Sequence, residues 1–419
     1  MDKLLIRGGR SLNGEVQISG AKNSALPIMA ATILCSAEAV IENIPDLKDI
    51  RTMSKMLEIL GASVRFEDNS RLVINTEHLT SKEAPYELVK TMRASVLTLG
   101  PLAARFGYAK VSLPGGCAIG ERPINLHLMG LEKMGAEITL SQGYVVATVK
   151  ALKGAYIYFD IPTVTGTENL MMAAVFAKGR TTLENAAREP EVQDLADYLN
   201  AMGAKVYGAG TSVVEIDGVE GLTPIPYRII PDRIETGTFI AIAGITAGDI
   251  LIKGCRADHI TAVIDKLQET GIVITEEASG LRVKAPAWGS LQCADVKTMP
   301  YPGFPTDMQA QFIALMSVAN GTSIVRETIF ENRFMHVAEL RRMGANIETE
   351  DNIATVRGVQ RLIGAPVMAT DLRASASLVV GALAAEGETL IERIYHLDRG
   401  YEKIEDKISR LGADVQRVR

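Results

Sequence analysis

Cysteine is scarce in this chain of 419 residues, which contains four. Four thiols do not form a disulfide framework in a chain of this length, so we expect a protein of the reducing cytoplasm. The sequence also lacks Cys-x-x-Cys pairs, His-Glu-x-x-His and closely paired histidines, and we therefore expect no structural metal. Neither common glycine-rich nucleotide loop, Gly-x-x-x-x-Gly-Lys-Ser/Thr or Gly-x-Gly-x-x-Gly, occurs.

Long apolar runs and an excess of positive charge are also missing. No stretch of about 18 uncharged apolar residues is present, so we expect no membrane span. The start, Met1-Asp2-Lys3, lacks the cationic and apolar regions of a secretion signal. The formal net charge of -6 argues against a general binder of nucleic acid or acidic membranes. A composition of 47% hydrophobic and 22% charged residues is typical of a globular protein with a large core.

A glycine followed by alanine or isoleucine recurs along the whole chain, each time after a helix-like segment. The six glycines, which lie 68 to 74 residues apart, are Gly61, Gly135, Gly203, Gly271, Gly344 and Gly412. A regular period indicates one structural unit built six times. Gly-Ala pairs are common by chance, but six evenly spaced copies with matching flanks favour a true repeat.

Each repeat contains two helix candidates of different character. The first is apolar almost all round, as in buried helices; these segments are 21–36, 92–106, 165–178, 235–247, 307–320 and 372–386. The second is amphipathic and ends at the repeated glycine, which suits a left-handed helix cap. Two short β-rich runs accompany them, so each repeat is predicted to be an α/β unit with its apolar helix beneath a sheet. Six repeats divide into two lobes of three, and a cleft between lobes is the default ligand site.

Basic residues stand at or just before many of the predicted helix starts. They are Lys22, Lys48, Arg93, Arg122, Arg233, Arg333, Arg373 and Arg399. A cation is locally unfavourable there, because a helix N-terminus carries partial positive charge. Ion pairing with neighbours such as Asp46, Asp49, Glu121, Glu331 and Asp398 is the alternative for any single one. Their recurrence favours a multiply anionic ligand, a phosphate or diphosphate with a carboxylate.

Two further positions are candidates for chemistry. Cys117 lies in a loop with three glycines within six residues, which is typical of a lid, and a nearby arginine can activate a thiol. This cysteine is either an acid or nucleophile, or a bystander in a turn. Asp307, at the start of an apolar helix, is either an N-cap or a general base facing the cleft.

Several motifs in this order resemble the enolpyruvyl transferase family, and among its members those that use UDP-N-acetylglucosamine. The motifs are Gly20-Ala21-Lys22-Asn23-Ser24-Ala25-Leu26-Pro27, Thr91-Met92-Arg93-Ala94-Ser95, Pro114-Gly115-Gly116-Cys117 with Arg122-Pro123, Pro231-Asp232-Arg233-Ile234-Glu235, Pro305-Thr306-Asp307-Met308-Gln309-Ala310-Gln311, Glu331-Asn332-Arg333-Phe334-Met335-His336, Thr370-Asp371-Leu372-Arg373-Ala374-Ser375 and Asp398-Arg399-Gly400-Tyr401. The resemblance covers essentially the whole chain.

The resemblance implies an inside-out α/β barrel of two lobes with three repeats each. Lobe one is expected to comprise residues 1–20 and 230–419, and lobe two residues 21–229 with the Cys117 loop. The implied activity is transfer of enolpyruvyl from phosphoenolpyruvate to the 3'-hydroxyl of UDP-N-acetylglucosamine, with release of phosphate and no metal or organic cofactor. It is the first committed step of peptidoglycan synthesis, and a monomer in the bacterial cytoplasm is expected.

The resemblance also implies roles for individual residues. Lys22, Arg122 and Arg399 should hold the phosphate of phosphoenolpyruvate, with Asn23 beside them, and Arg333 and Arg373 its carboxylate. Asp307 should take the proton of the hydroxyl, and Cys117 should protonate the methylene carbon or form a covalent phospholactoyl adduct. The nucleotide sugar should contact Arg93, Arg122, Pro123, Ile124, Asn125, Leu126, Ile161, Pro162, Thr163, Val164, Asp307 and Ile329.

One departure and two rival hypotheses qualify this expectation. Some members carry a nucleotide-facing lysine near the start of the third repeat, where this chain has Asp160-Ile161-Pro162-Thr163-Val164. The side-chain contact to the diphosphate is therefore not expected there, whereas backbone contacts of residues 161–164 are. The nearest rival activity is that of the shikimate-pathway enolpyruvyl transferases, although the Gly-Gly-Cys loop resembles the UDP-sugar enzymes. The other rival is a non-enzymatic ring of six α/β units on nucleic acid, which the acidic balance disfavours.

Overall fold

The computed structural model describes residues 2–68, 70–113 and 124–419. They form two compact units. Residues 20–113 and 124–230 form one, here called the N-terminal body, and residues 2–19 and 231–419 form the other, the C-terminal body. Each body has its own hydrophobic core. No helix among the described residues is long and apolar enough to cross a bilayer.

The described residues of the N-terminal body form three four-stranded sheets, ordered β14-β3-β5-β4, β6-β7-β9-β8 and β10-β11-β13-β12. The strands are β3 Glu38–Glu42, β4 Ser63–Glu67, β5 Arg71–Asn75, β6 Glu83–Ala84, β7 Tyr108–Ser112, β8 Glu137–Ser141, β9 Tyr144–Thr148, β10 Tyr156–Tyr158, β11 Arg180–Glu184, β12 Lys205–Tyr207, β13 Val213–Asp217 and β14 Tyr227–Arg228. The helices are α1 Lys22–Ala31, η1 Thr32–Leu34, α2 Lys48–Leu60, α3 Tyr86–Val89, η2 Arg93–Thr98, α4 Leu99–Phe106, α5 Asn125–Lys133, α6 Val164–Ala174 and α7 Pro190–Ala201.

The C-terminal body repeats this plan with sheets β16-β17-β15-β2, β18-β19-β21-β20 and β22-β23-β1-β24. Its strands are β1 Lys3–Arg7, β2 Asn13–Gln17, β15 Asp249–Lys253, β16 Val273–Glu277, β17 Gly280–Lys284, β18 Val296–Lys297, β19 Thr322–Arg326, β20 Asn346–Glu350, β21 Ile353–Arg357, β22 Pro366–Met368, β23 Glu388–Glu392 and β24 Asp414–Val418. The helices are α8 Arg233–Ile245, η3 Ala257–His259, α9 Thr261–Glu269, η4 Thr306–Met308, α10 Gln309–Met316, α11 Met335–Arg342, α12 Leu372–Ala384, η5 Leu397–Arg399 and α13 Ile404–Arg410.

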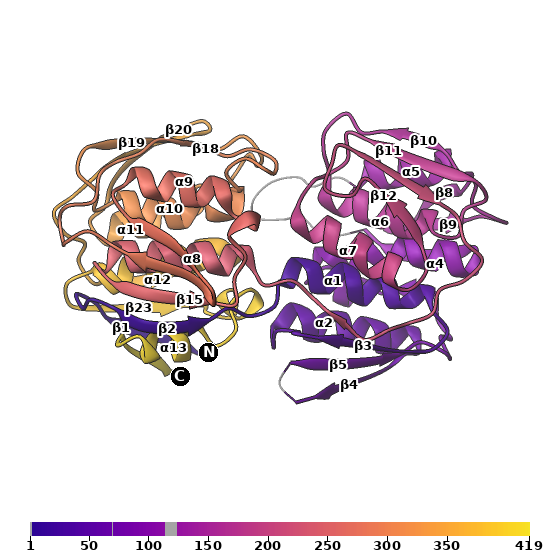
Figure 1. Cartoon of the computed structure of the whole chain (residues 1–419), viewed down its shortest axis with the longest axis horizontal. Coiled ribbons are helices and arrows are strands. Elements are labelled where there is room, and N and C mark those ends of the chain that lie inside the picture. The colour runs from indigo at the N-terminus through magenta and orange to yellow at the C-terminus, as the bar shows by residue number, and fades with distance from the viewer. Residues whose placement is uncertain (1, 69, 114–123) are drawn as a thin grey trace. The chain divides into compact units, whose positions relative to one another are not determined.

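The apolar helices lie at the centre of each body, beneath the sheets. All 13 residues of α8 are buried, and α12 is buried except at Leu372, because neither helix has a polar face to offer to water. In the C-terminal body α10 packs on α12, and α12 on α8, inside the ring of strands seen in Figure 1. The predicted architecture of six α/β repeats, three in each body, is confirmed.

The six repeated glycines end the amphipathic helices as predicted. All six have positive φ, between 89° and 107°, a conformation that residues with a Cβ rarely adopt. Gly61 illustrates the geometry: it caps α2 with φ of 107°, and its N–H donates to Glu58 O at 2.9 Å. The chain then turns directly into β4.

The expectation of two strands per repeat was incomplete, because each sheet contains four. An opening strand pairs in parallel with the strand after the inner helix, and a closing strand is antiparallel to its neighbours, as in β18-β19-β21-β20. Some of these strands come from distant parts of the sequence. β1 lies between β23 and β24, β2 beside β15, and β14 beside β3. Figure 1 shows the N-terminal strand β1 next to β23 near the other end of the chain.

Candidate active site

A buried cluster of two arginines and one aspartate lies at the N-terminal ends of the inner helices of the C-terminal body. Asp307 is in η4, immediately before α10, Arg373 is the second residue of α12, and Arg333 lies just before α11. Arg333 Nη2 lies 2.9 Å from Asp307 Oδ1, and Arg373 Nε lies 3.2 Å from Asp307 Oδ2. The arginine side chains are only 5% and 3% exposed, whereas Asp307 is 27% exposed. Asp307 is therefore the member of the cluster that faces outward.

The alternative that Asp307 caps its helix was wrong. Pro305 occupies the cap position, and no side chain caps that end of the helix. The carboxylate instead bridges two guanidinium groups, one on each oxygen. Two cations that converge on one carboxylate make this position electrostatically suited to a further carboxylate or phosphate.

Arg373 is held in place by its own helix and by a buried tyrosine. Asp371 is the N-cap of α12, and its Oδ1 accepts from the N–H groups of Arg373 and Ala374 at 2.8 and 3.0 Å. The guanidinium lies 5.5 Å from the ring centroid of Tyr401. Burial alone would lower the pKa of Arg373, but the charge of Asp307, followed by Tyr401, raises it overall. Arg373 is therefore a permanent cation in an apolar setting.

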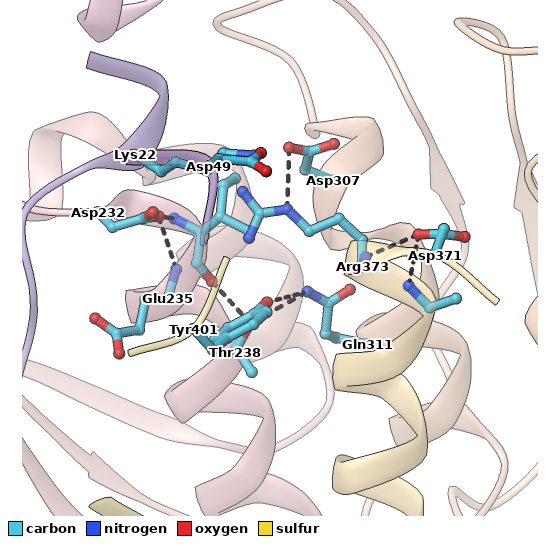
Figure 2. A network of polar contacts seen from close by, with 12 residues as sticks. Lys22, Asp49, Asp232, Glu235, Thr238, Asp307, Gln311, Asp371, Arg373 and Tyr401 are labelled. Atoms are coloured by element: carbon cyan, nitrogen blue, oxygen red, sulfur yellow. Dashed lines mark hydrogen bonds and ion pairs between the residues drawn. The ribbon is translucent and has the colours of Figure 1, made fainter. Parts of the chain in front are cut away.

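The tyrosine beneath Arg373 belongs to a small buried network of its own. Tyr401 Oη lies 2.8 Å from Thr238 Oγ1, and Gln311 Nε2 donates to both oxygens at 3.1 Å. Figure 2 shows this triangle beside Arg373, with Asp307 on the other side of the guanidinium. Since Thr238, Gln311 and Tyr401 come from α8, α10 and the segment after η5, the network fixes Arg373 against all three repeats of this body.

Two donor groups of the cluster have no hydrogen-bond partner among the residues that the structure describes. They are Nη1 of Arg333 and Nη1 of Arg373, and both are buried. Buried polar groups nearly always have partners, so unpaired donors beside a partly exposed carboxylate require an explanation. The explanation we favour is an anion with two oxygens, such as a substrate carboxylate, that accepts from both donors.

The N-terminal body has its own buried cation at the start of an inner helix. Lys22 is the first residue of α1, and its Nζ lies 3.4 Å from Oδ2 of Asp49, the second residue of α2. Both side chains, labelled in Figure 2, are less than 10% exposed. The first turn of α1 is fixed further by Ser24, whose hydroxyl donates to the buried Asp194. Asp194 also accepts from Tyr227 Oη at 2.7 Å and from Ile230 N at 3.3 Å.

Arg93 lies close to a buried histidine. Asn169 Oδ1 accepts from Gly100 N at 2.7 Å, so its Nδ2 faces His127 Nδ1 at 2.9 Å. Nδ1 of His127 is therefore the unprotonated ring nitrogen. Its Nε2 carries the proton and donates to Thr165 Oγ1 at 3.3 Å. Burial, and secondly the charge of Arg93, lowers the pKa of His127 to about 3. This pair places Arg93 beside the start of α5 and α6.

The remaining predicted contacts occupy varied positions. Thr163 is the N-cap of α6, whereas Ile161 and Pro162 before it are exposed. Ile124 is buried, and Asn125 and Leu126 open α5. The Ile329 N–H already donates to Glu327 Oε1 at 2.8 Å, so that backbone can offer a ligand its carbonyl only.

Arg399 is the last residue of the short helix η5 and does not open an α-helix. Its neighbour Asp398, which was considered as an ion-pair partner, pairs with Arg417 at 2.7 Å. Cys117, Arg122 and Pro123 lie outside the described residues. Among those that are described, no group of three or more His, Cys, Asp or Glu side chains could hold a metal ion.

Sequence reasoning did not single out several residues that shape these sites. Asp371, Gln311 and Tyr401 stand within the motifs given above, and the position of Asp371 at a predicted helix start is a cap signal that could have been read. Asp194 and Asn169 stand in none of these motifs, and their partners are distant in the sequence.

The family model described as EPSP synthase (3-phosphoshikimate 1-carboxyvinyltransferase) matches residues 6–408 of the chain. The chain belongs to this enolpyruvyl transferase family. It is 64% identical over 420 residues to a UDP-N-acetylglucosamine 1-carboxyvinyltransferase of Thermodesulfovibrio yellowstonii, and 59% identical over 419 residues to one of Geotalea daltonii. Both alignments cover 100% of each chain. The predicted resemblance is thereby confirmed, and this enolpyruvyl transferase is an enzyme.

Solved structures of relatives agree on the fold. The enolpyruvyl transferase NikO from Streptomyces tendae has a TM-score of 0.89 with 27% identity, and covers 100% of this chain and 99% of its own. EPSP synthase from Acinetobacter baumannii has a TM-score of 0.76 with 19% identity over the whole of both chains, which concerns the fold alone.

Proposed function

We propose that this enolpyruvyl transferase moves the enolpyruvyl group of phosphoenolpyruvate to the 3'-hydroxyl of UDP-N-acetylglucosamine and releases phosphate. The identity of 64% over the full length to a relative of that name supports the choice of acceptor. The observation that carries the chemistry is the Arg333–Asp307–Arg373 cluster, with its two buried, unpartnered guanidinium nitrogens. The proposal includes a role in peptidoglycan synthesis, a monomer and the bacterial cytoplasm.

The proposed reaction is an addition followed by an elimination. In the addition, the sugar 3'-oxygen forms a bond to C2 of phosphoenolpyruvate, its proton passes to Asp307, and Cys117 donates a proton to C3. The product is a tetrahedral phospho-ketal. In the elimination, the bond from C2 to the phosphate oxygen breaks, C3 returns a proton to the Cys117 thiolate, and the departing phosphate takes up the proton held by Asp307. A covalent phospholactoyl adduct on Cys117 is the alternative form of the thiol's role.

The arginine pair explains how Asp307 becomes available as a base. In the structure both oxygens of Asp307 are engaged by Arg333 and Arg373. A substrate carboxylate that binds these arginines competes with Asp307 for the same donors. We propose that arrival of phosphoenolpyruvate thereby releases Asp307 to accept the hydroxyl proton, so that the base is freed only when the substrate is present.

The other cations are assigned to the phosphate and the nucleotide sugar. Lys22, Arg122 and Arg399 would hold the phosphate with Asn23 beside them, and cations fixed before the reaction need no reorganisation as phosphate departs. Arg93, residues 122–126, residues 161–164 and the Ile329 carbonyl would contact the nucleotide sugar. Since Lys22 belongs to one body and Arg399 to the other, the proposal treats the two bodies as the predicted lobes that close over the substrates.

Phosphate release with matched acceptors tests the proposal. The purified chain should release phosphate from phosphoenolpyruvate when UDP-N-acetylglucosamine is added, and the sugar should gain the mass of one enolpyruvyl group. Shikimate 3-phosphate should give no release. Release with shikimate 3-phosphate and none with the nucleotide sugar would overturn the proposal.

A further inference from the structure

Glu327 lies directly after β19 and is only 2% exposed, and its carboxylate accepts four hydrogen bonds. Oε1 accepts from Thr298 Oγ1 at 2.8 Å and from the N–H groups of Ile329 and Phe330 at 2.8 and 3.2 Å. Oε2 accepts from Thr306 Oγ1 at 2.8 Å. All four of these donors are neutral. Within the described part of the chain, this buried carboxylate is therefore stabilised by hydrogen bonds and not by an ion pair.

The backbone that carries this carboxylate is fixed as well. The N–H of Glu327 donates to Asn352 O at 2.8 Å, and its carbonyl accepts from Asn352 Nδ2 at 3.0 Å. Thr298 is held in turn, because its N–H donates to the last carbonyl of β19 at 2.9 Å and its hydroxyl accepts from Thr328 N at 2.9 Å. Since the carboxylate is held from both sides, the segments that donate to it take their positions from it.

The corresponding residue of two other repeats has the opposite polarity. Asn185 directly follows β11, and its Nδ2 donates to Phe159 O at 2.8 Å. Asn43, directly after β3, donates in the same way to the residue that follows β14. Thr298 holds the place of Phe159, since each follows the opening strand of its sheet and donates its N–H to the last carbonyl of the neighbouring strand, at 2.9 and 3.0 Å. The fifth repeat therefore has an acceptor, Glu327, where the first and third repeats have a donor.

A local turn explains only part of this arrangement. A carboxylate that accepts from the N–H groups two and three residues later closes a turn of the backbone, and such bonds are common in loops. Thr306, however, lies 21 residues earlier in the chain and belongs to a different element, η4. A turn does not require this contact. The two oxygens of Glu327 thus join two separate segments of the fifth repeat.

Both segments carry groups of the buried arginine–aspartate cluster. Thr306 directly precedes Asp307 in η4, so Oε2 fixes the segment of the proposed base. Phe330 supports Arg333, whose guanidinium lies 5.1 Å from the centroid of the ring. Ile329 gives its N–H to the carboxylate, which leaves its carbonyl for the nucleotide sugar. Oε1 therefore fixes the loop with the arginine and the proposed acceptor contact.

We propose that Glu327 is a positioning residue that sets the acceptor hydroxyl and the base Asp307 relative to each other. It touches neither substrate, and it acts through Thr306 on one side and through Ile329 and Phe330 on the other. Because its donors are neutral, it does not compete with Asp307 or with a substrate carboxylate for the arginines. The inference rests on the proposed function, and the test below separates the two.

Thr306→Val tests the link through Oε2, because valine keeps the shape of threonine but lacks the hydroxyl. We expect kcat to fall about tenfold, with both KM values within about twofold of wild type, since the base shifts while the substrate contacts stay. Thr246→Val is the matched control, because this buried threonine at the end of α8 donates to Ile242 O at the same 2.8 Å. It should lower the unfolding temperature by a similar amount and leave kcat and both KM values within about twofold of wild type.

Two substitutions of the carboxylate itself test both links together. Glu327→Ala removes both, so kcat should fall about 100-fold and KM for UDP-N-acetylglucosamine should rise about tenfold. Glu327→Gln keeps one oxygen for the donors on Oε1, and its amide can donate to the Thr306 hydroxyl. It should therefore restore kcat to within about tenfold of wild type. If Glu327→Ala shows no cooperative unfolding transition, Thr306→Val and Glu327→Gln carry the test.

The outcomes separate this inference from the proposed function. Equal kinetics of Thr306→Val and Thr246→Val, or a higher KM with kcat unchanged in Thr306→Val, would overturn the positioning role. A Glu327→Gln variant as inactive as a folded Glu327→Ala would do the same, because the hydrogen bonds would not account for the effect. No phosphate release by the wild-type chain with UDP-N-acetylglucosamine would instead overturn the proposed function. The same variants would then be compared with shikimate 3-phosphate as acceptor, and no release with either acceptor would remove the reaction on which the inference rests.

Discussion

The two bodies have the same three-repeat plan, yet they use the two ends of their inner helices differently. At the N-terminal ends, the C-terminal body gathers Arg333 and Arg373 around Asp307, whereas the N-terminal body pairs Lys22 with Asp49. At the C-terminal ends, Arg105 of the N-terminal body donates to backbone carbonyls of the neighbouring repeat, whereas the residue two before the corresponding glycine of the C-terminal body is Ala319. The comparison teaches that the repeat fixes the backbone frame and that single side chains decide which polar contacts form at its helix ends.

Arg373→Ala should have the largest effect, because it removes one of the two buried cations that contact Asp307 in the C-terminal body. We expect kcat/KM for phosphoenolpyruvate to fall about 1,000-fold, the range for loss of a fixed, buried charge contact to a reacting group. Steady-state kinetics measure this change. Arg357→Ala, which removes an exposed arginine paired with Glu348, is the matched control and should be nearly silent. Equal activity of the two variants would break the comparison.

Asp307→Asn should lower kcat by roughly 100-fold, because an amide cannot accept the proton of the acceptor hydroxyl. The amide is nearly isosteric with the carboxylate, so the fold should persist, and circular dichroism checks this. Binding of phosphoenolpyruvate should hold or tighten, since its carboxylate no longer competes with a negative side chain for Arg333 and Arg373. Loss of binding with kcat unchanged would assign Asp307 to substrate positioning instead.

Arg105→Ala should remove the side chain that joins the carbonyl groups of Ile33, Cys35 and Thr76 in the N-terminal body. We expect the free energy of unfolding to fall by about 2 kcal/mol, because three carbonyl groups lose a charged donor. Ethylguanidinium at millimolar concentration should restore part of the loss, as measured by thermal unfolding. Arg65→Ala, at an exposed ion pair, is the control and should cost under about 0.5 kcal/mol without rescue. Equal rescue of both variants would show that the ligand acts on the protein in general.

Acid should destabilise the N-terminal body through His127. Its pKa is about 3 in the folded protein, against a usual 6.5, because burial disfavours the charged ring. The stability that the neutral ring contributes is therefore complete above pH 6.5 and is lost as the pH falls from 6.5 towards 3. At pH 5.5 the loss should be on the order of 1 kcal/mol.

His127→Gln lacks this titration, so its denaturant unfolding should depend less on pH between 6.5 and 5. His336 of the C-terminal body is the matched comparison, because burial lowers its pKa to about 4. His336→Gln should show the same flattening for the other body. Parallel pH profiles of wild type and both variants would contradict the account of neutral, buried rings.

The sequence predicted the repeated frame well because local physics determines it. The glycines at the helix ends adopt positive φ because the helix cap itself requires it. The apolar helices have no polar face that could be exposed to water, so they are buried. The partners of β1, β2 and β14 were not predicted, since these strands pair with segments hundreds of residues away or are only two residues long. The contacts of Asp307 could not be predicted for the same reason. Its position at a helix start is visible in the local sequence, but its two arginine partners are distant in the sequence.

The most direct test of the central claim is a crystal structure with UDP-N-acetylglucosamine and a non-reactive analogue of phosphoenolpyruvate. We predict that the analogue's carboxylate lies within about 3.2 Å of Nη1 of both Arg333 and Arg373, with Asp307 released towards the sugar 3'-hydroxyl. A carboxylate bound elsewhere, with both arginines still paired to Asp307, would contradict the account.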